Sequence, residues 1–222
     1  MRQRRIFVAG STGATGRELL ALPQSKLQLD IVAHARPNKA REQELDPRTV
    51  VLDLGDPSSL DEALRDRTTV VQLIGTVRAR FGAGDTYESS DVGTTRSLVE
   101  ASRRAGIDHF ILLSAVGAGT PVGAYLKAKA AAEELVRQSG VPFTIFRPST
   151  FEGGRQPRLP GVSALLRGLG LAKVAPIALV DLAQSILWVA RTRGSLGEVL
   201  EGKSLWRVVE AARSDVRSDV LT

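Results

Sequence analysis

The sequence predicts an α/β fold, with a Rossmann-like, doubly wound parallel sheet in three layers. Apolar runs alternate with helical patterns from Ile6 to Phe146, which is typical of consecutive βαβ units. The runs are continuous, as in Phe110–Leu113, and strands buried on both faces of a parallel sheet have this composition. A turn with three glycines, Gly10–Gly16, separates the first apolar run from the first helical pattern. Because ligands of such sheets gather at the carboxyl ends of the strands, this turn marks the expected ligand side.

Six strands and five helices are expected before the chain reaches Arg147. The strands are predicted at Ile6–Ala9, Leu29–Ala35, Val50–Leu54, Thr69–Ile74, Phe110–Leu113 and Phe143–Phe146. The helices are predicted at Gly16–Leu22, Lys39–Leu45, Ser59–Arg65, Thr86–Ala105 and Ala124–Ser139. Ser59 with Glu62 has the form of a capping box, and Gly106 and Gly140 stand where left-handed helix ends are expected.

Beyond Pro148 the pattern loosens into a loop over residues 149–161. This loop is long enough to cover a bound substrate, and a plain irregular connection fits it equally well. Asp181 is predicted to cap a helix that starts at Leu182 and ends at about Arg193. The chain is expected to close with a short strand, Glu198–Leu200, and a charged tail.

The length and composition favour one compact domain without metal or disulfide. A chain of 222 residues has room for one well-packed α/β domain, residues 1–222, in which 149–180 form a substrate-side loop and helix. The absence of cysteine excludes disulfides, thiolate metal sites and thiol nucleophiles, and two histidines cannot by themselves form a metal site. The basic N-terminus leads into a short apolar run broken by glycine, so neither a secretory signal nor a membrane span is predicted. A cytoplasmic location is therefore expected.

The formal net charge of +6 comes from basic residues that are scattered along the chain rather than gathered in one segment. Scattered charge favours a solvated surface over a nucleic-acid-binding face. It also attracts a phosphorylated cofactor. The expected partner is a small-molecule substrate, with no nucleic acid and no membrane.

The glycine turn has the features of a phosphate-binding loop. Its first glycine lets the chain turn off the strand, its second lets backbone N–H groups approach a pyrophosphate, and its third lets the helix pack closely on the sheet. The hydroxyl groups between the glycines can also reach phosphate oxygens, and the helix N-terminus offers unpaired N–H groups. A glycine-rich turn without a ligand is the alternative. The predicted cofactor contacts are Gly10, Thr12, Gly13, Ala14, Thr15 and Gly16.

At the end of the second strand, where an NAD-binding protein usually carries an acid, this sequence has Arg36. A guanidinium there can pair with the 2′-phosphate of NADP, and the absence of a carboxylate removes the repulsion that excludes that phosphate. NADP is therefore the predicted cofactor. An exposed arginine at the start of a helix is the alternative interpretation.

Four residues at the ends of the next two strands complete this set of predicted cofactor contacts: Asp53, Leu54, Gly75 and Thr76. Asp53 can accept a hydrogen bond from the adenine amino group, and Gly75 lets the backbone pass close to the cofactor riboses. Local turn chemistry explains either residue equally well.

Tyr125 and Lys129 stand one helical turn apart, on the same face of a predicted helix. An ammonium group stabilises tyrosinate, so this pair can serve as a general acid for a carbonyl that receives a hydride. Ser114, at the carboxyl end of the fifth strand, can hydrogen-bond the same carbonyl. Ser114, Tyr125 and Lys129 are the predicted catalytic residues.

Together these residues resemble the atypical short-chain dehydrogenase/reductases, the NAD(P)H-binding or NmrA-like group. The resemblance extends from Ile6 to about Leu200. It rests on the glycine turn, Asp91-Val92-Gly93-Thr94, Ser114, Tyr125 with Lys129, and Phe146-Arg147-Pro148.

The resemblance implies that Lys129 also holds the cofactor and that Pro148 and Thr150 lie near the nicotinamide carboxamide. Better-known members carry Asn at the position of Asp91, where it organises a water relay to the lysine. A carboxylate there either alters Lys129 or is purely structural. The group also contains proteins that bind NADP without efficient turnover and act as redox sensors.

The leading hypothesis is an NADP-dependent oxidoreductase that transfers a hydride between NADPH and a small carbonyl, imine or quinone-like substrate. An NADP(H)-binding redox sensor or regulatory protein with little turnover is the main alternative. A nucleotide-sugar epimerase comes third, because the chain after Pro148 is short for a sugar-nucleotide subdomain.

Overall fold

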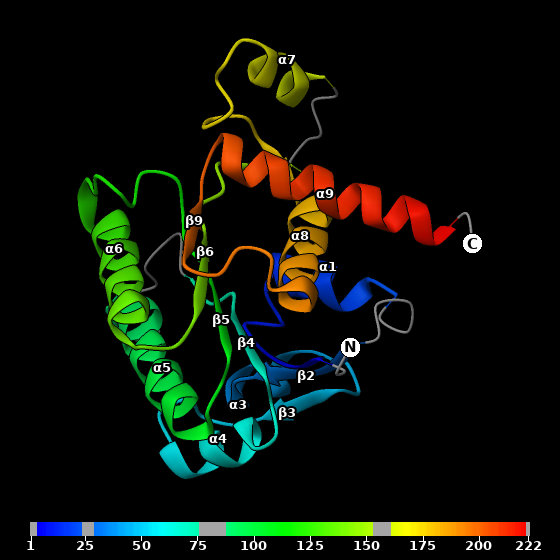
Figure 1. Ribbon diagram of the computed structural model, residues 1–222. Coiled ribbons are helices and arrows are strands. Elements are labelled where there is room, and N and C mark those ends of the chain that lie inside the picture. Colours follow the sequence, from blue (N-terminus) through cyan, green and yellow to red (C-terminus); the bar gives the residue numbers. More distant parts are fainter. Residues whose placement is uncertain (1–3, 24–28, 76–87, 153–160, 221–222) are drawn as a thin grey trace.

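The computed structural model describes residues 4–23, 29–75, 88–152 and 161–220 (Figure 1). At its centre lies a seven-stranded, fully parallel sheet with the order β3-β2-β1-β4-β5-β6-β9. The strands are β1 Arg4–Ala9, β2 Leu29–Ala35, β3 Thr49–Val51, β4 Thr69–Gln72, β5 His109–Leu113, β6 Phe143–Phe146 and β9 Glu198–Leu200. The strand order reverses between β1 and β4, and this switch point is where doubly wound sheets bind ligands. The predicted fold class is confirmed.

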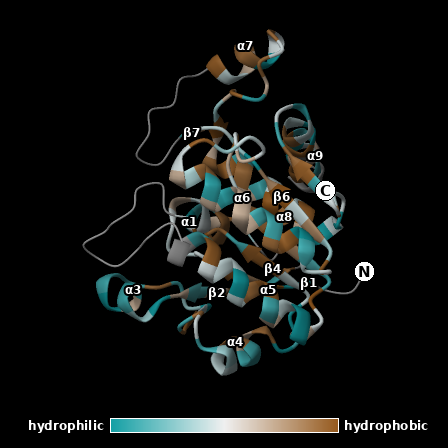
Figure 2. Ribbon diagram, turned by 90° about the vertical axis from the view of Figure 1, so that its left-hand side faces the viewer, coloured by the Kyte–Doolittle hydropathy of each residue, from teal (hydrophilic) through white to brown (hydrophobic). Residues whose placement is uncertain are grey.

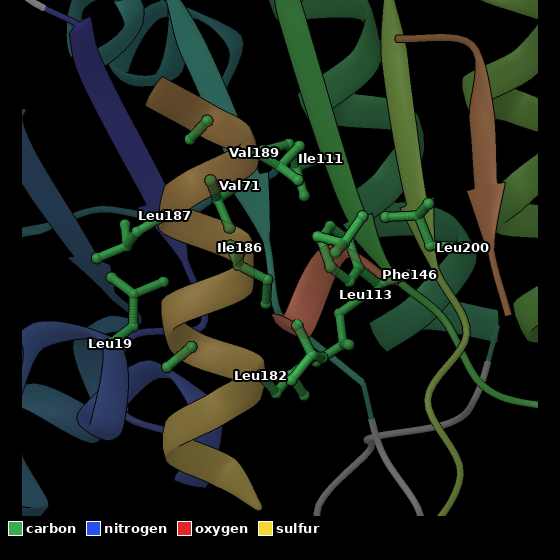
Figure 3. Close-up of a cluster of buried hydrophobic side chains, with 14 of the residues drawn as sticks. Leu19, Val71, Ile111, Leu113, Phe146, Leu182, Ile186, Leu187, Val189 and Leu200 are labelled. Atoms are coloured by element: carbon green, nitrogen blue, oxygen red, sulfur yellow. The ribbon is translucent and has the colours of Figure 1, made fainter. Parts of the chain in front are cut away.

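Alternate side chains of the central strands point into two separate apolar cores, one on each face of the sheet. In β1, Ile6 and Val8 face one layer of helices, whereas Phe7 and Ala9 face the other. Both cores consist of side chains that are almost fully buried, which explains the continuous apolar runs. The first layer contains α1 Ala14–Ala21, α8 Leu179–Thr192 and α9 Lys203–Val220, and Figure 3 shows α8 packed on the sheet. The second contains α4 Pro57–Leu64, α5 Thr94–Ala105 and α6 Gly123–Gln138.

The remaining elements lie outside these two cores or lead into them. Helix α3 (Pro37–Glu42) buries no side chain, and Figure 2 shows it as almost entirely hydrophilic. A π-helical turn, η2 (Glu88–Gly93), leads directly into α5. After β6, a small parallel pair, β7 (Phe151–Glu152) and β8 (Ile177–Ala178), flanks helix α7 (Val162–Gly168). Within the described ranges, no helix is long and apolar enough to cross a membrane.

Helix α4 is capped by Asp56 rather than by the predicted capping box. The Asp56 carboxylate accepts a hydrogen bond from the backbone N–H of Ser58 (3.1 Å), and Pro57 occupies the first helical position. Ser59 therefore lies within the helix and its hydroxyl donates to Asp56. Proline at the first position and a carboxylate just before it fix the helix start earlier than the box predicts. The predictions for Gly106 (φ +66°) and Gly140 (φ +74°) are confirmed, since both adopt left-handed conformations.

The C-terminal segment differs most from the prediction. Helix α8 begins at Leu179, so Asp181 lies in its first turn and does not cap it. Its carboxylate instead accepts from the Arg213 guanidinium of α9 (Nε to Oδ1, 2.8 Å). The predicted charged tail is the amphipathic helix α9, whose apolar side chains pack against α8. These buried residues recur at helical spacing and are Leu205, Trp206, Val208, Val209 and Ala212. The predicted strand Glu198–Leu200 is confirmed as β9.

A buried histidine links β5 to β6. Thr144 donates its hydroxyl proton to the carbonyl of Ser195 (2.7 Å), so the ring of His109 must donate from Nε2 to the Thr144 oxygen (2.9 Å). Nδ1 has no hydrogen-bond partner among the described residues. Burial, together with the positive charges of Arg4 and Arg193, lowers the pKa of His109 to about 3. The ring is therefore neutral in the folded protein.

We expect the free energy of unfolding to decrease as the pH falls below about 6.5, the ordinary pKa of histidine. Between that pH and about 3 the unfolded chain binds a proton at His109 that the folded protein excludes, so stability present above pH 6.5 is lost towards acid. At pH 5 the loss attributable to His109 is about 2 kcal/mol. Urea unfolding at pH 7.5 and 5.0 measures it. The variant His109→Gln keeps an N–H donor and should lose about that much of the pH dependence; an unchanged dependence would contradict the assignment.

Candidate cofactor-binding and active site

The glycine turn joins the carboxyl end of β1 to α1, beside the end of β4. Gly10 has φ +91°, and a Cβ there would lie 2.9 Å from the backbone nitrogen of Ile74. A Cβ on Gly16 would lie 2.4 Å from the carbonyl oxygen of Gly10 and 2.6 Å from Cα of Ser11. The fold itself therefore requires glycine at both positions.

Gly13 is different, because the protein's own packing makes a side chain there tight rather than impossible. It is exposed, its φ of −74° suits any residue, and the nearest atom to an added Cβ is the carbonyl oxygen of Gly10 at 3.3 Å. Gly13 is also the N-cap of α1 and provides no side-chain hydrogen bond to the first turn. The first turn of α1 therefore has no side-chain cap, and helix N-termini of this kind bind anions such as pyrophosphate.

The other residues of the turn divide into buried and open positions. Thr15 is buried, and the hydroxyl of Ser11 donates to the carbonyl of His34 in β2 (2.8 Å). Thr12 is half-buried and Ala14 is exposed beside Gly13. The turn therefore offers a ligand mainly its backbone around Thr12, Gly13 and Ala14.

A cavity of about 290 Å³ opens between this turn and the segment before β3. Its lining contains Ser11, Thr12, Arg17, Leu20, Ala21, Gln43, Glu44, Leu45, Asp46 and Thr49. The guanidinium of Arg17 donates to the carbonyl of Thr12 (2.7 Å), which places a positive charge at the mouth of the phosphate turn. Arg17 was not among the predicted cofactor contacts. Its position directly after Gly16, in the first turn of α1, indicates a basic side chain beside the glycine turn.

Arg36 stands at the carboxyl end of β2, exposed, as the N-cap residue of α3. The pKa of the buried His34 ring is lowered first by burial and further by the charge of Arg36, against the raising effect of its hydrogen bond to the carbonyl of Leu52. The charge of Arg36 therefore acts on the buried end of β2, and its contact with a 2′-phosphate stays a prediction.

Asp53 and Leu54 lie in the turn after β3, which ends earlier than predicted, at Val51. The carboxylate of Asp53 is exposed and accepts from the backbone N–H of Gly55 (2.9 Å), a local turn contact. The side chain of Leu54 is 3% exposed and packs in the second core. Their contact with the cofactor stays a prediction.

Lys129 is the centre of the candidate active site. Its ammonium group lies 2.7 Å from the carboxylate of Asp91, 3.2 Å from the carbonyl oxygen of Leu113 at the end of β5, and 6.0 Å from the centre of the Tyr125 ring. A Cβ on Gly75, just beyond β4, would lie 2.4 Å from Nζ of Lys129. The fold thus brings the ends of two neighbouring strands, η2 and α6 together around Lys129 at the carboxyl edge of the sheet. The contacts predicted for Tyr125, Lys129 and Gly75 with substrate and cofactor stay predictions.

The π-helical turn η2 presents Asp91 to this point. The hydroxyl of Thr95 donates to the carbonyl of Asp91, and the side-chain amide of Gln72 donates to Thr95 Oγ1 (2.8 Å). All three residues are buried. These bonds fix the backbone of Asp91, and π-helical turns occur often at functional sites.

Ser114 follows β5 but directs its hydroxyl into a buried ion network. It donates to the carboxylate of Glu133 (2.6 Å), which also accepts from Arg147 (Nε, 2.8 Å) and Arg137 (2.7 Å). Burial alone raises the pKa of the Glu133 carboxyl, but the hydrogen bonds from Arg147, Ser114 and Arg137 outweigh it and hold that pKa below its usual value. Because the one hydroxyl proton of Ser114 is used, Ser114 can accept from a ligand but not donate. Its catalytic role stays a prediction.

The chain beyond β6 is anchored through its backbone. The carbonyl of Pro148 accepts from the N–H of Val116 (2.9 Å), and that of Thr150 accepts from the N–H of Ile177 (2.9 Å). Pro148 is buried and Thr150 is exposed. Their predicted contact with the nicotinamide is untested. Thr76 and most of the predicted loop, residues 153–160, lie outside the residues that the structure describes.

The sequence model of the NAD(P)H-binding family matches residues 10–187, from the phosphate turn to α8. The chain belongs to this NAD(P)H-binding family. The resemblance to atypical short-chain dehydrogenase/reductases is thereby confirmed, as is the NAD(P)H-binding Rossmann fold that the family shares.

Two relatives carry the name of reductases. The ceramide reductase of Caulobacter vibrioides is 29% identical over 202 residues, which cover 84% of this chain and 61% of that protein. The (4-alkanoyl-5-oxo-2,5-dihydrofuran-3-yl)methyl phosphate reductase of Streptomyces griseus is 29% identical over 178 residues, with 79% and 58% covered. This chain thus spans about three fifths of the length of these curated relatives.

Among solved structures, the oxidoreductase ylbE of Lactococcus lactis superimposes with a TM-score of 0.65. The two sequences are 22% identical, and the match covers 93% of this chain and 95% of that one. This likeness shows the shared fold.

Substituting Gly13 and Gly16 by alanine should separate ligand binding from folding. Gly13→Ala should change the free energy of unfolding by less than about 1 kcal/mol while weakening NADPH binding at least about tenfold, because the methyl group occupies the space that the pyrophosphate needs. Gly16→Ala should cost about 1–3 kcal/mol of stability, because its Cβ overlaps the backbone of Gly10. Urea unfolding and titration calorimetry measure the two effects. Parental NADPH affinity in Gly13→Ala would show that the turn binds no phosphate.

Proposed function

We propose that the protein is an NADPH-dependent reductase that transfers a hydride to a small carbonyl, imine or quinone-like compound. The observation that carries the proposal is the position of Lys129, within 6.0 Å of the Tyr125 ring and directly beneath Gly75 at the ligand edge of the sheet. The reductase names of the two relatives support the reaction class.

When bound, the reduced nicotinamide supplies the hydride to the carbonyl carbon, and the electron pair of the C=O bond moves to the oxygen. Tyr125 donates its phenolic proton to that oxygen as the negative charge develops. Lys129 stabilises the resulting tyrosinate through its ammonium group, an effect that the paired carboxylate of Asp91 reduces. The backbone around Gly13 and the first turn of α1 hold the pyrophosphate, so the reacting groups are held in place by the sheet edge.

The substrate is proposed to lie between α6 and the segment 149–180, which contains β7, α7 and β8 and follows β6 at its carboxyl end. The backbone bonds of Pro148 and Thr150 fix the start of this segment beside the candidate site. Four large apolar side chains among its described residues are exposed, namely Leu165, Leu169, Leu171 and Val174, which favours a substrate with apolar surface.

NADPH is the proposed cofactor because two arginines stand at this edge of the sheet: Arg36 at the carboxyl end of β2, and Arg17 in α1, whose guanidinium donates to the carbonyl of Thr12 in the glycine turn. A 2′-phosphate placed between them gains charge-assisted hydrogen bonds that NADH lacks. Glu44 and Asp46 line the adjoining cavity, but the Asp46 carboxylate is neutralised by Arg48.

Replacing Arg36 by Asp should weaken NADPH binding roughly ten- to hundredfold and leave NADH affinity equal or higher, because the variant repels a 2′-phosphate. Titration calorimetry with both cofactors measures the change. Arg41→Asp, on the far turn of α3, makes the same change of charge and should have little effect on either affinity. Equal affinities of the parent protein for NADPH and NADH would contradict the proposed cofactor.

Replacing Tyr125 by Phe keeps the ring beside Lys129 but removes the proton donor. If Tyr125 is the general acid, kcat should fall by about 10²–10⁴ while NADPH affinity remains near the parental value. A panel of aldehydes, ketones, imines and quinones, followed by NADPH absorbance, provides the assay.

The same panel distinguishes the enzyme from a redox sensor. A parent protein that binds NADPH tightly but reduces no member of the panel favours the sensor. Full activity of Tyr125→Phe would show that the proton comes from another group.

A further inference from the structure

The ammonium of Lys129 and the carboxylate of Asp91 form a buried ion pair, with side chains 4% and 2% exposed and 2.7 Å between Nζ and Oδ1. Both charges lie in a region of low dielectric, where either charge alone would act strongly on nearby groups. Because the two have opposite signs, their effects on a nearby group largely cancel. The candidate site therefore contains a neutral pair rather than an isolated ammonium.

The backbone of Gly75, just beyond β4, lies next to this pair. It is exposed, and an added Cβ would lie 2.4 Å from Nζ of Lys129 and 3.4 Å from Oδ1 of Asp91. A group bound against the Gly75 backbone is consequently close to both charges.

The two redox forms of a nicotinamide differ in charge, since the oxidised ring is cationic and the reduced ring is neutral. An isolated ammonium repels the oxidised ring but leaves the reduced ring almost unaffected. We propose that Asp91 cancels this repulsion and thereby strengthens the binding of NADP⁺ selectively, so that it sets the relative affinity for the two redox forms. The inference rests on the proposed function, because it requires the nicotinamide of NADP(H) to bind over Gly75.

The carboxylate also sets the reducing power of the bound cofactor. Selective stabilisation of the oxidised form lowers the reduction potential of the bound couple. A tenfold selective effect corresponds to about 30 mV for a two-electron couple. An asparagine at this position would keep the shape but not the charge, so the bound NADPH would be a weaker reductant.

The test compares the dissociation constants of NADP⁺ and NADPH, because a merely structural loss changes both in the same proportion. Asp91→Asn should raise the Kd of NADP⁺ about tenfold more than that of NADPH. Lys129→Met should shift the ratio in the opposite direction, and the double variant, in which neither charge remains, should return it to within about threefold of the parent. Asp181→Asn serves as the control, because it removes one paired carboxylate from α8, in the other helix layer.

Titration calorimetry on the folded variants gives both constants for each protein. A parental ratio in Asp91→Asn overturns the inference while leaving the proposed function intact. If Asp91→Asn does not fold, the ratio in Lys129→Met decides, and a value unchanged from the parent overturns the inference. Failure of the parent protein to bind either redox form would instead contradict the proposed function.

Discussion

The buried carboxylate of Glu133 connects α6 to the ends of two strands, and the geometry of the candidate site depends on that connection. It accepts hydrogen bonds from Ser114 after β5, from Arg147 after β6, and from Arg137 on its own helix. Lys129 lies one turn earlier on α6 and Tyr125 two turns earlier, so the register of α6 against the strand ends places both. A carboxylate with so many donors stays ionised when buried, and removal of a donor leaves part of its charge unpaired.

The same edge of the sheet contains a second buried ion pair with a different role. Glu133 is surrounded by donors from its own fold, whereas Lys129 and Asp91 lie beneath a glycine that leaves them close to the surface. The first network holds elements together, and we propose that the second acts on a bound cofactor. This difference follows from what covers each group rather than from its chemistry, because each joins a carboxylate to one or more cationic side chains.

The glycines show the same division between folding and ligand binding. Gly10 and Gly16 have no space for a side chain, so the close approach of α1 to the strand ends accounts for them. Gly13 has an ordinary backbone conformation and only a tight contact with the carbonyl of Gly10, and Gly75 faces Lys129. The structure separates these cases, because it shows which glycines lie against backbone and which lie at the exposed edge of the sheet. The spacing predicts a phosphate turn, and the packing leaves Gly13 as the glycine that we propose a phosphate approaches.

Local patterns in the sequence were sufficient for the strands of the sheet, the phosphate turn, the left-handed glycines after α5 and α6, and the shared face of Tyr125 and Lys129. Each depends on residues within a few positions of one another, where spacing and backbone preference act directly.

The predicted cap at Asp181 and the predicted tail after β9 were wrong, because Asp181 pairs with Arg213 and α9 is stabilised by packing on α8. Likewise, the pairing of Asp91 with Lys129 and of Ser114 with Glu133 joins side chains 38 and 19 positions apart. The packing of the sheet and its two helix layers determines such contacts, because it brings distant side chains together in the interior. A buried charge is unfavourable there unless it is paired or hydrogen-bonded. The sequence by itself determined the elements and the chemistry available to them, and the tertiary structure decided which charges meet.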